Sequence, residues 1–207
     1  MKTSERIRLI IELNDHFSKN GFAQYKMIDI AKLLNISRAK LYQYFSSKED
    51  IVSSICERYF LYVRENPIPL NFDKRQFYEN FELVSLNAMM LSGSATDRFL
   101  SDLRKDFTQL ASTLTAVLTS YQRSAQAFYE IAKQKKWLRE DLNVEVLMLN
   151  DESFVMRLLM IKNKDEIYKL TTAYRVMRRH LAFSDATVNR LELTQADRLF
   201  DKIIPKV

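Results

Sequence analysis

The chain has 207 residues, of which 47% are hydrophobic and 28% charged, a composition typical of a soluble globular protein. Its 2 glycines and 3 prolines are too few for the turns of a sheet protein and predict a nearly all-helical fold. The single cysteine excludes an internal disulfide and fits the reducing cytoplasm, where we expect the protein to reside. Because MKTSERIRL lacks an apolar signal core and no uncharged run suits a bilayer, we expect no secretion and no membrane association.

The net charge of +6 is unevenly distributed along the chain. Residues 1–48 hold nine Lys and Arg against four Asp and Glu, whereas the remainder holds 23 against 22. A basic segment of this kind suits contact with the phosphates of nucleic acid, and a solvated basic surface is the simpler alternative.

The sequence carries no recognisable catalytic or metal-binding motif. It has no glycine-rich phosphate loop, no G-x-S-x-G nucleophile motif and no H-E-x-x-H zinc motif. Its two histidines and one cysteine lie far apart and make a poor set of metal ligands. We therefore expect a protein that is not an enzyme and that uses no metal or other cofactor.

The first expected helix covers about residues 5–20. Thr3 or Ser4 can cap its start, and Gly21 is well placed just after its end. Its apolar stripe, which must cover the helices that follow, consists of Leu9, Leu13 and Phe17. Positive charge at its start, expected to face phosphates, comes from Lys2, Arg6 and Arg8.

Two short helices and a tight turn are expected next, within residues 26–48. One face of the first helix is apolar at helical spacing and consists of Met27, Ile30, Ala31 and Leu34. Asn35 follows at a position that favours a left-handed backbone, and Ser37 can cap a second helix that runs to about Phe45. The arrangement predicts a helix-turn-helix, with Ser37–Phe45 as its recognition helix.

The expected recognition helix has an inward and an outward side. Leu41 and Phe45 point inward, whereas the outward side carries a small residue, cations, an amide and tyrosines. Such a side suits the major groove of DNA, where amides and cations can bond base edges and phosphates. The expected DNA contacts, including flanking positions, are Lys26, Ser37, Arg38, Ala39, Lys40, Tyr42, Gln43, Tyr44 and Lys48.

A longer pattern runs through about residues 5–60. It consists of Phe17-xxx-Gly21-Phe22, Ile30-Ala31, Ile36-Ser37, Leu41-Tyr42-x-Tyr44-Phe45 and Lys48-Glu49. The pattern resembles the TetR family of bacterial transcriptional regulators, which implies a dimeric DNA-binding regulator with a second, helical domain. The chain departs from the family pattern at Tyr25-Lys26, Asn35 and Ala39-Lys40, and the last departure concerns the preferred bases.

Helices are also expected throughout the rest of the chain. The fourth covers about Lys48 to Arg64 and ends before Asn66-Pro67-Ile68-Pro69. The later ones cover about 73–91, 95–105, 107–136, 144–162, 164–183 and 194–204, with Gly93 and Ser94 separating the first two. The expected fold is all-α: a three-helix DNA-binding domain at 1–47, a connecting helix at 48–65, and a helical bundle for effector binding and dimerisation at 66–207.

Two expected helices, 144–162 and 164–183, carry apolar side chains at coiled-coil spacing. We expect these helices from two chains to form a four-helix interface, because a single helix-turn-helix reads few bases and a dimer reads two half-sites. Packing within one chain is the alternative. The expected interface residues are Val155, Leu158, Ile167, Leu170, Tyr174, Met177 and Leu181.

The same part of the chain is rich in large, pliable side chains, which favour a pocket for an apolar or aromatic effector or else an ordinary core. The candidate pocket residues are Phe77, Phe81, Met89, Phe107, Tyr121 and Phe128. We therefore expect a homodimeric repressor that a small molecule releases from a double-stranded DNA operator. Two alternatives are a related regulator whose second domain binds a protein partner and a helical adaptor that has lost DNA binding.

Overall fold

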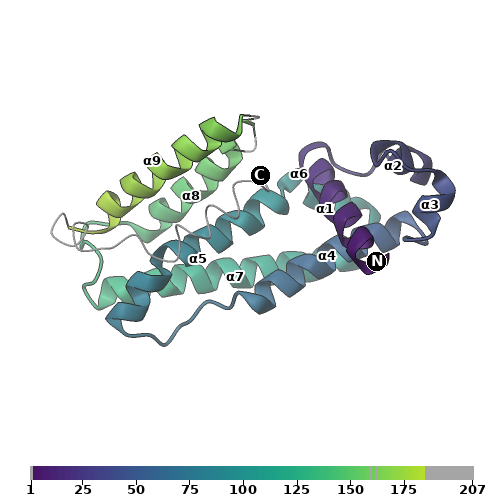
Figure 1. The fold of residues 1–207 in the computed structure, drawn as a ribbon. Helices are drawn as coiled ribbons and strands as arrows, with labels where there is room; N and C mark the ends of the chain where they lie inside the picture. Colours follow the sequence, from purple (N-terminus) through teal and green to yellow (C-terminus); the bar gives the residue numbers. More distant parts are fainter. Residues whose placement is uncertain (1, 159, 162, 185–207) are drawn as a thin grey trace. The chain divides into compact units, whose positions relative to one another are not determined.

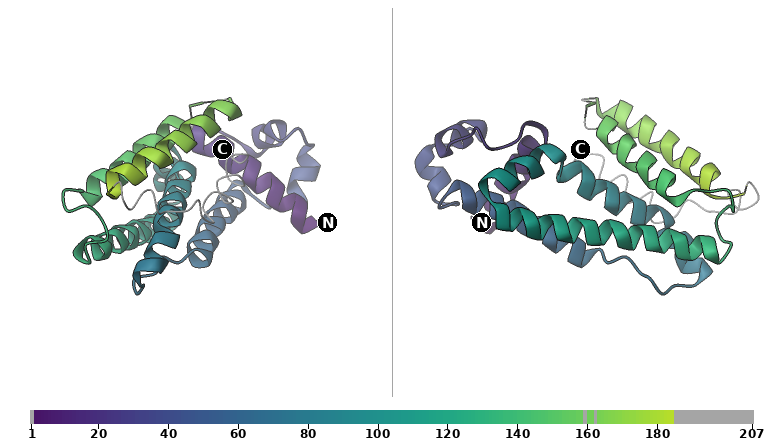
Figure 2. Two further views of the ribbon diagram at one scale, coloured as in Figure 1. Left: turned by 60° about the vertical axis from the view of Figure 1, so that its left-hand side comes forward. Right: turned by 180° about the vertical axis from the view of Figure 1, so that it is seen from behind.

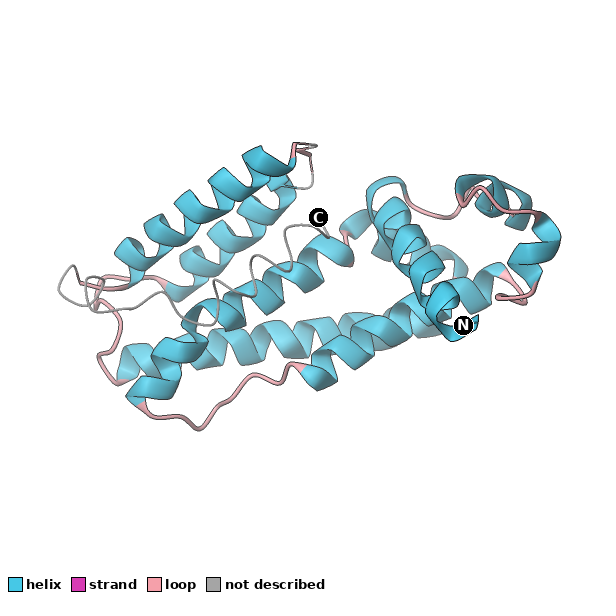
Figure 3. Ribbon diagram, in the orientation of Figure 1, coloured by secondary structure: helices cyan, strands magenta, loops and turns pink. Residues whose placement is uncertain are grey.

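A computed structural model describes residues 2–158, 160–161 and 163–184, and helices connected by loops account for this part of the chain (Figures 1 and 3). The described residues contain no strand, which confirms the all-α prediction. Contacts divide the chain into two compact units. Unit 1 comprises Met1–Pro67 and Ser94–Ser120, and unit 2 comprises Ile68–Gly93 and Tyr121–Val207. The expected domain boundaries at 47/48 and 65/66 stay a prediction.

Unit 1 contains the predicted helix-turn-helix. Its helices are α1 (Lys2–Asn20), α2 (Met27–Leu33), α3 (Arg38–Tyr42), α4 (Lys48–Glu65), α6 (Asp97–Asp106) and the first part of α7 (Thr108–Gln134). The predicted stripe of α1 is buried at Leu9, Leu13 and Phe17. Around it lie buried side chains of the other helices, among them Ile30, Leu41, Ile51 and Phe99. Within unit 1, α1 packs against α4 and α6, and α2 packs against α3.

Several helix boundaries differ from the sequence prediction, among them the end of α8 (Val144–Leu158), which was expected to run to residue 162. Helix α1 begins at Lys2, so Thr3 and Ser4 do not cap it. Helix α3 ends at Tyr42, three residues early. Helix α5 (Lys74–Ser94) continues through Gly93, where a break was expected. A Cβ at Gly93 would lie 2.8 Å from Val155 Cγ1, so this glycine allows α5 to approach α8 closely.

Unit 2 contains α5, the rest of α7, α8 (Val144–Leu158) and α9 (Lys164–Ala182). Its main core is an aromatic cluster that includes Phe72, Phe77, Phe81, Phe128 and Phe183. Helices α8 and α9 lie side by side (Figure 2). The expected helix at 194–204 falls outside the described residues. No described helix combines the length and apolar character needed to cross a membrane.

A buried polar cluster joins α8 to α5, α7 and α9. The Asp151 carboxylate accepts hydrogen bonds from Ser85 Oγ at 2.7 Å, Tyr174 Oη at 2.7 Å and Arg178 Nε at 2.8 Å. Burial alone would lower the pKa of Arg178, but the charge of Asp151 and the contact with Tyr129 together outweigh this effect and raise that pKa. Because the ion pair is buried and fully hydrogen-bonded, removal of either partner would leave an uncompensated charge.

Candidate nucleic-acid interface

The turn between α2 and α3 has the local geometry that the sequence predicts. Asn35 adopts a left-handed backbone with φ of 52°, and Ile36 N donates to Ala31 O at 3.0 Å. Ser37 is the N-cap of α3, where its Oγ accepts a hydrogen bond from Lys40 N at 3.1 Å. Each feature follows from a local rule: asparagine tolerates the left-handed region, and a serine oxygen satisfies an unpaired N–H at a helix start.

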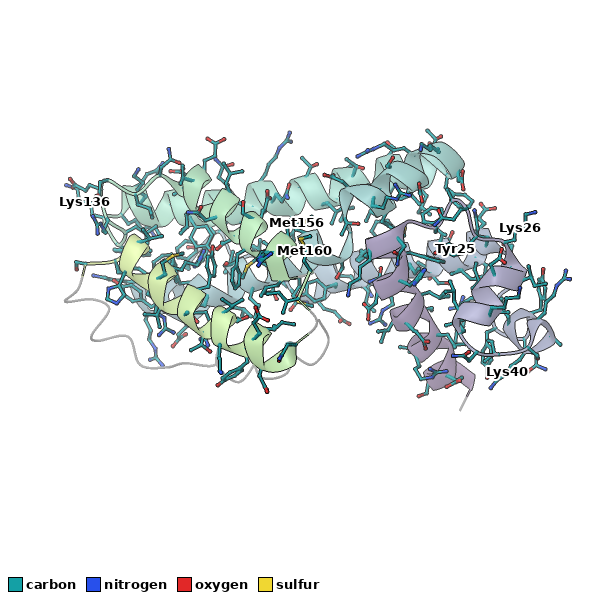
Figure 4. All side chains as sticks on the ribbon, turned by 90° about the horizontal axis from the view of Figure 1, so that it is seen from above. Tyr25, Lys26, Lys40, Lys136, Met156 and Met160 are labelled. Atoms are coloured by element: carbon teal, nitrogen blue, oxygen red, sulfur yellow. The ribbon has the colours of Figure 1, made fainter. Side chains whose placement is uncertain are left out.

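Helix α3 separates its residues into a buried and an exposed side. Leu41 and Phe45 are at most 1% exposed and anchor α3 to the core of unit 1. The exposed residues are Arg38, Ala39, Lys40, Tyr42 and Gln43, with the Arg38 guanidinium 5.6 Å from the centre of the Tyr42 ring. Lys26 and Lys40 are both exposed on the helix-turn-helix segment (Figure 4). The outward side expected from the sequence is therefore open to a partner.

Two of the expected DNA contacts, Tyr44 and Lys48, are partly buried and also take part in contacts within unit 1. Tyr44 is half-buried, and its carbonyl oxygen accepts a hydrogen bond from Arg6 Nε at 3.1 Å. Lys48 Nζ lies 3.1 Å from both Ala23 O and Asp106 Oδ2, and 5.5 Å from the centre of the Phe22 ring. Lys48 therefore already has partners within unit 1, which a DNA phosphate would have to replace.

Helix α6 holds the loop between α1 and α2. The buried Asp102 carboxylate accepts hydrogen bonds from Phe22 N at 2.7 Å and Ala23 N at 2.9 Å. Gly21, with φ of 74°, makes this approach possible, since a Cβ there would lie 2.4 Å from Asp102 Oδ2. Thr96 Oγ1 also donates to Ser18 O at 2.6 Å. Sequence reasoning placed Gly21 correctly after α1 but missed Asp102, which lies 80 residues from Phe22.

Tyr25 supports the same loop from the side of α1. Its hydroxyl lies 2.8 Å from His16 Nε2, and its ring stacks on Phe17 with 6.0 Å between the ring centres. The start of α2 follows directly, where Lys26 N donates to Asp29 Oδ2 at 3.1 Å. The position of the helix-turn-helix thus depends on contacts with α1 as well as α6.

The expected dimer residues divide into two groups. Val155, Leu158, Ile167 and Tyr174 are at most 9% exposed within the single chain. By contrast, Leu170, Met177 and Leu181 are 37%, 44% and 42% exposed. The stripe predicted on α9 thus covers two neighbouring sides of the helix, and one of them packs inside unit 2, where Tyr174 stacks on Phe154 at 3.9 Å between ring centres.

The six candidate pocket residues do not come together. Phe77, Phe81 and Phe128 belong to the aromatic core of unit 2. Phe107 lies in unit 1, stacked against Phe22 with 6.1 Å between the ring centres. Tyr121 is buried elsewhere on α7.

Met89 lines a small cavity in unit 2. The cavity lies among α5, α7 and α8 and has a volume of about 20 Å³, which is room for about one water molecule. Met148, Tyr129 and Asp151 also line it. Burial raises the pKa of Tyr129 to about 12, and its hydroxyl donates to Phe81 O at 2.8 Å. Among the described residues, no group of three His, Cys, Asp or Glu could hold a metal ion.

Comparison with known proteins finds a family that resembles the helix-turn-helix segment. Residues 15–55 match the model described as "Bacterial regulatory proteins, tetR family". No curated protein matches the chain. A crystal structure of a TetR-family transcriptional regulator from Haemophilus influenzae is similar, with 15% sequence identity over 88% of this chain and 98% of that one and a TM-score of 0.39.

The matched segment, residues 15–55, spans the end of α1, all of α2 and α3 and the start of α4. These are the elements whose turn, cap and exposed side have the geometry of a helix-turn-helix. Over residues 15–55 the chain thus has the DNA-binding segment of TetR-family bacterial regulators, in sequence and in geometry, which supports a DNA-binding transcriptional regulator.

Proposed function

We propose that the protein is a cytoplasmic, dimeric repressor that binds a two-fold operator through α3 and leaves it when a small molecule binds unit 2. The observation that carries the proposal is the exposed side of α3, with Arg38, Lys40 and Gln43 above the buried Leu41. Glutamine can bond adenine edges, and Lys or Arg can bond guanine or phosphate. Because the side chain of Ala39 is small, the backbone of α3 can approach the major groove of DNA closely.

The dimer is proposed to form through α8 and α9. Large apolar side chains of α9 are exposed in the single chain, including Leu170 and Met177. On α8, Val146, Leu149 and Met156 are each more than half exposed at spacings of three and seven residues, and Met160 follows four residues later (Figure 4). Exposed apolar patches of this kind mark protein interfaces. A two-fold dimer would present two α3 helices to two half-sites.

The effector site is proposed in unit 2, at the cavity among α5, α7 and α8. Its present volume of about 20 Å³ is far below the several hundred Å³ of ordinary ligand pockets. An effector must therefore widen it, and Met89 and Met148 have the flexible side chains that allow repacking. A site that opens only for its ligand links binding to a change of shape, as a releasable repressor requires.

The small cavity also favours the second candidate, in which unit 2 binds a protein partner and takes no small-molecule effector. The two candidates share the DNA-binding role of unit 1. They differ in the response of the melting temperature to small molecules, since a ligand that binds the folded state stabilises it.

The test begins with selection of duplexes by the full chain from a randomised pool. We expect one enriched, two-fold symmetric sequence, bound by two chains in sedimentation. Small apolar and aromatic molecules are then screened by thermal shift, and those that raise the melting temperature are expected to lower duplex affinity. Failure to enrich any sequence would contradict the DNA-binding proposal. Enrichment with no thermal shift across the screen would favour the protein-partner candidate.

A further inference from the structure

Helix α3 is too short to be stable without help. It spans five residues, Arg38–Tyr42, whereas isolated helices shorter than about 12 residues are marginal in water. Its final turn continues through Gln43 to Phe45, with Tyr44 N and Phe45 N each donating to Leu41 O at 3.0 Å. Gln43, an expected base contact, lies in this turn. Accurate recognition therefore requires that something outside α3 holds its end.

The Arg6 side chain of α1 contacts this end directly. Its Nε donates to Tyr44 O at 3.1 Å, and its guanidinium carbon lies 4.9 Å from the centre of the Phe45 ring. Its Nη2 donates to Asp50 Oδ1 at 2.9 Å and to Ser54 Oγ at 2.6 Å. One planar guanidinium thus joins α1, the last turn of α3 and the first turns of α4. A cation beside the carbonyls at a helix end also interacts favourably with the helix dipole.

Asp50 completes the contact from the side of α4. While Oδ1 binds Arg6, Oδ2 accepts hydrogen bonds from Ser46 N at 2.8 Å and Ser46 Oγ at 3.1 Å. The carboxylate therefore ties Arg6 to the loop that leaves α3. Charge-assisted hydrogen bonds from a planar guanidinium fix direction as well as distance, which a flexible ammonium would not do.

We propose that Arg6 is a positioning residue for DNA recognition: it orients the base-reading turn of α3 through Tyr44, Phe45 and Asp50 and does not bind a phosphate. This inference rests on the proposed role of α3 in reading DNA. It reverses the expectation from charge alone, which grouped Arg6 with Arg8 at a phosphate-facing helix start.

Arg8 provides a matched control two residues away on the same helix. Its guanidinium pairs with Glu5 and Glu12, each at 2.9 Å, and its side chain is 54% exposed. Both partners lie on α1 itself, so Arg8 makes surface pairs of little consequence for stability. Arg6→Ala and Arg8→Ala remove the same charge from the same helix, but they remove different contacts.

The first measurement is the affinity of the full-length wild type, Arg6→Ala, Arg6→Lys and Arg8→Ala for the selected duplex at several salt concentrations. Arg6→Ala is expected to lose at least about fivefold in affinity, as for coupled contacts. Its slope of log affinity against log salt should remain that of the wild type, because a lost phosphate contact would reduce the slope by about one. Arg6→Lys should restore the charge but little of the affinity, and Arg8→Ala should keep its affinity for the selected duplex.

The second measurement needs no DNA. Hydrogen exchange of the free protein should speed up in Arg6→Ala within residues 41–46 and remain unchanged in the peptides of α5 to α9, which also shows that the variant is folded. If Arg6→Ala does not fold, Arg6→Lys is compared in the same way. A reduced salt slope, full rescue by lysine, or unchanged exchange at 41–46 would each overturn the inference. If the wild type selects no duplex, the proposed function fails, and exchange alone decides the role of Arg6.

Discussion

At the scale of single residues, the negative charge of Asp50 contributes to the stability of unit 1. Partial burial alone would raise the pKa of Asp50, but the hydrogen bonds from Ser46 and the contact with Arg6 outweigh it and lower that pKa. A carboxyl group with a depressed pKa in the folded state stabilises the protein above its unfolded pKa, about 3.9. The contribution is lost as the pH falls through the folded pKa.

We therefore predict that Asp50→Asn lowers the melting temperature at neutral pH and that the difference from the wild type disappears in acid. Thermal melts of both proteins from neutral pH to below about pH 3 would measure this difference. A difference that stays constant over the whole range would show that the charge of Asp50 does not stabilise the fold.

Lys48 and Lys26 were expected to act alike and are placed differently. Lys48 is bound to Ala23 O and Asp106, whereas Lys26 is exposed at the start of α2. We predict that Lys26→Ala reduces the salt slope of duplex binding by about one. Lys48→Ala should weaken binding by loosening the loop before α2 and leave the slope unchanged. Equal slopes for the two variants would refute this distinction.

Local rules predicted some residues of the site and missed others for a definite reason. Asn35, Ser37 and Leu41 take their roles from backbone preference, capping and helical periodicity, which act within a few residues. Arg6 and Asp102 act on groups 38 and 80 residues away. An arginine that contacts a phosphate and one that contacts a carbonyl group of its own protein look alike in a sequence. Only the packing of the helices distinguishes the two roles.

At the scale of helices, α9 shows how an apolar stripe is divided. Thr171, Tyr174 and Arg178 lie on the side that packs within unit 2, and Leu170 and Met177 lie on a neighbouring exposed side. The spacing alone could not show which residues of the stripe pack within the chain and which stay exposed, because Tyr174 lies at the same coiled-coil spacing as Leu170 and Met177. Tyr174 therefore belongs to the fold of unit 2 and is a poor test of dimerisation.

We predict that Leu170→Asp combined with Met177→Asp makes the protein monomeric in sedimentation with little loss of helical content. The new charges would be buried without partners in the dimer but solvated in the monomer. Thr172→Asp is the control, because it adds a charge about 200° around the helix from Leu170. A double variant that remains dimeric would place the interface elsewhere.

Helix positions were predicted more closely than helix ends. The helix predicted at about 164–183 is Lys164–Ala182 in the structure, and the helix predicted at about 107–136 is Thr108–Gln134. The errors arose where tertiary contacts override local preference. Gly93 lies within α5, where its missing Cβ leaves room for Val155 of α8, and α3 ends at Tyr42, before a turn that runs to Phe45.

At the scale of the whole molecule, the proposed switch must connect unit 2 with α3. The chain passes between the units at three points: from Pro67 to Ile68, from Gly93 to Ser94 and from Ser120 to Tyr121. The first of these follows α4, which begins at Lys48, and the second leads into α6, whose Asp102 holds the loop before α2. Both α4 and α6 can therefore transmit a change to the helix-turn-helix.

We predict that an effector changes the separation of the two α3 helices in the dimer. That separation must match one turn of DNA, about 34–36 Å, so a shift of a few ångströms abolishes binding. Spin labels at Gln24 of both chains, with Cys56→Ala, would measure the distance with and without effector. Release of DNA at an unchanged label distance would contradict this mechanism.

A cavity variant tests whether that effector acts through unit 2. Ala88 lines the cavity, whereas Ala116 is exposed on the part of α7 that belongs to unit 1. Ala88→Leu should abolish the thermal shift and the release of DNA, because its larger side chain occupies the space that the effector needs. Ala116→Leu, which adds the same bulk outside the cavity, should respond as the wild type does. A normal response of Ala88→Leu would place the effector site elsewhere.

The central claim is that α3 reads base sequence, and the most direct measurement compares two duplexes of equal length and charge. The wild type should bind the selected duplex at least about a thousandfold more tightly than its scrambled counterpart. Lys40→Ala and Gln43→Ala should each reduce that preference by about 1–3 kcal/mol, while binding to the scrambled duplex changes little. Equal affinity of the wild type for the two duplexes, or an undiminished preference in both variants, would contradict the assignment of α3 as the recognition helix.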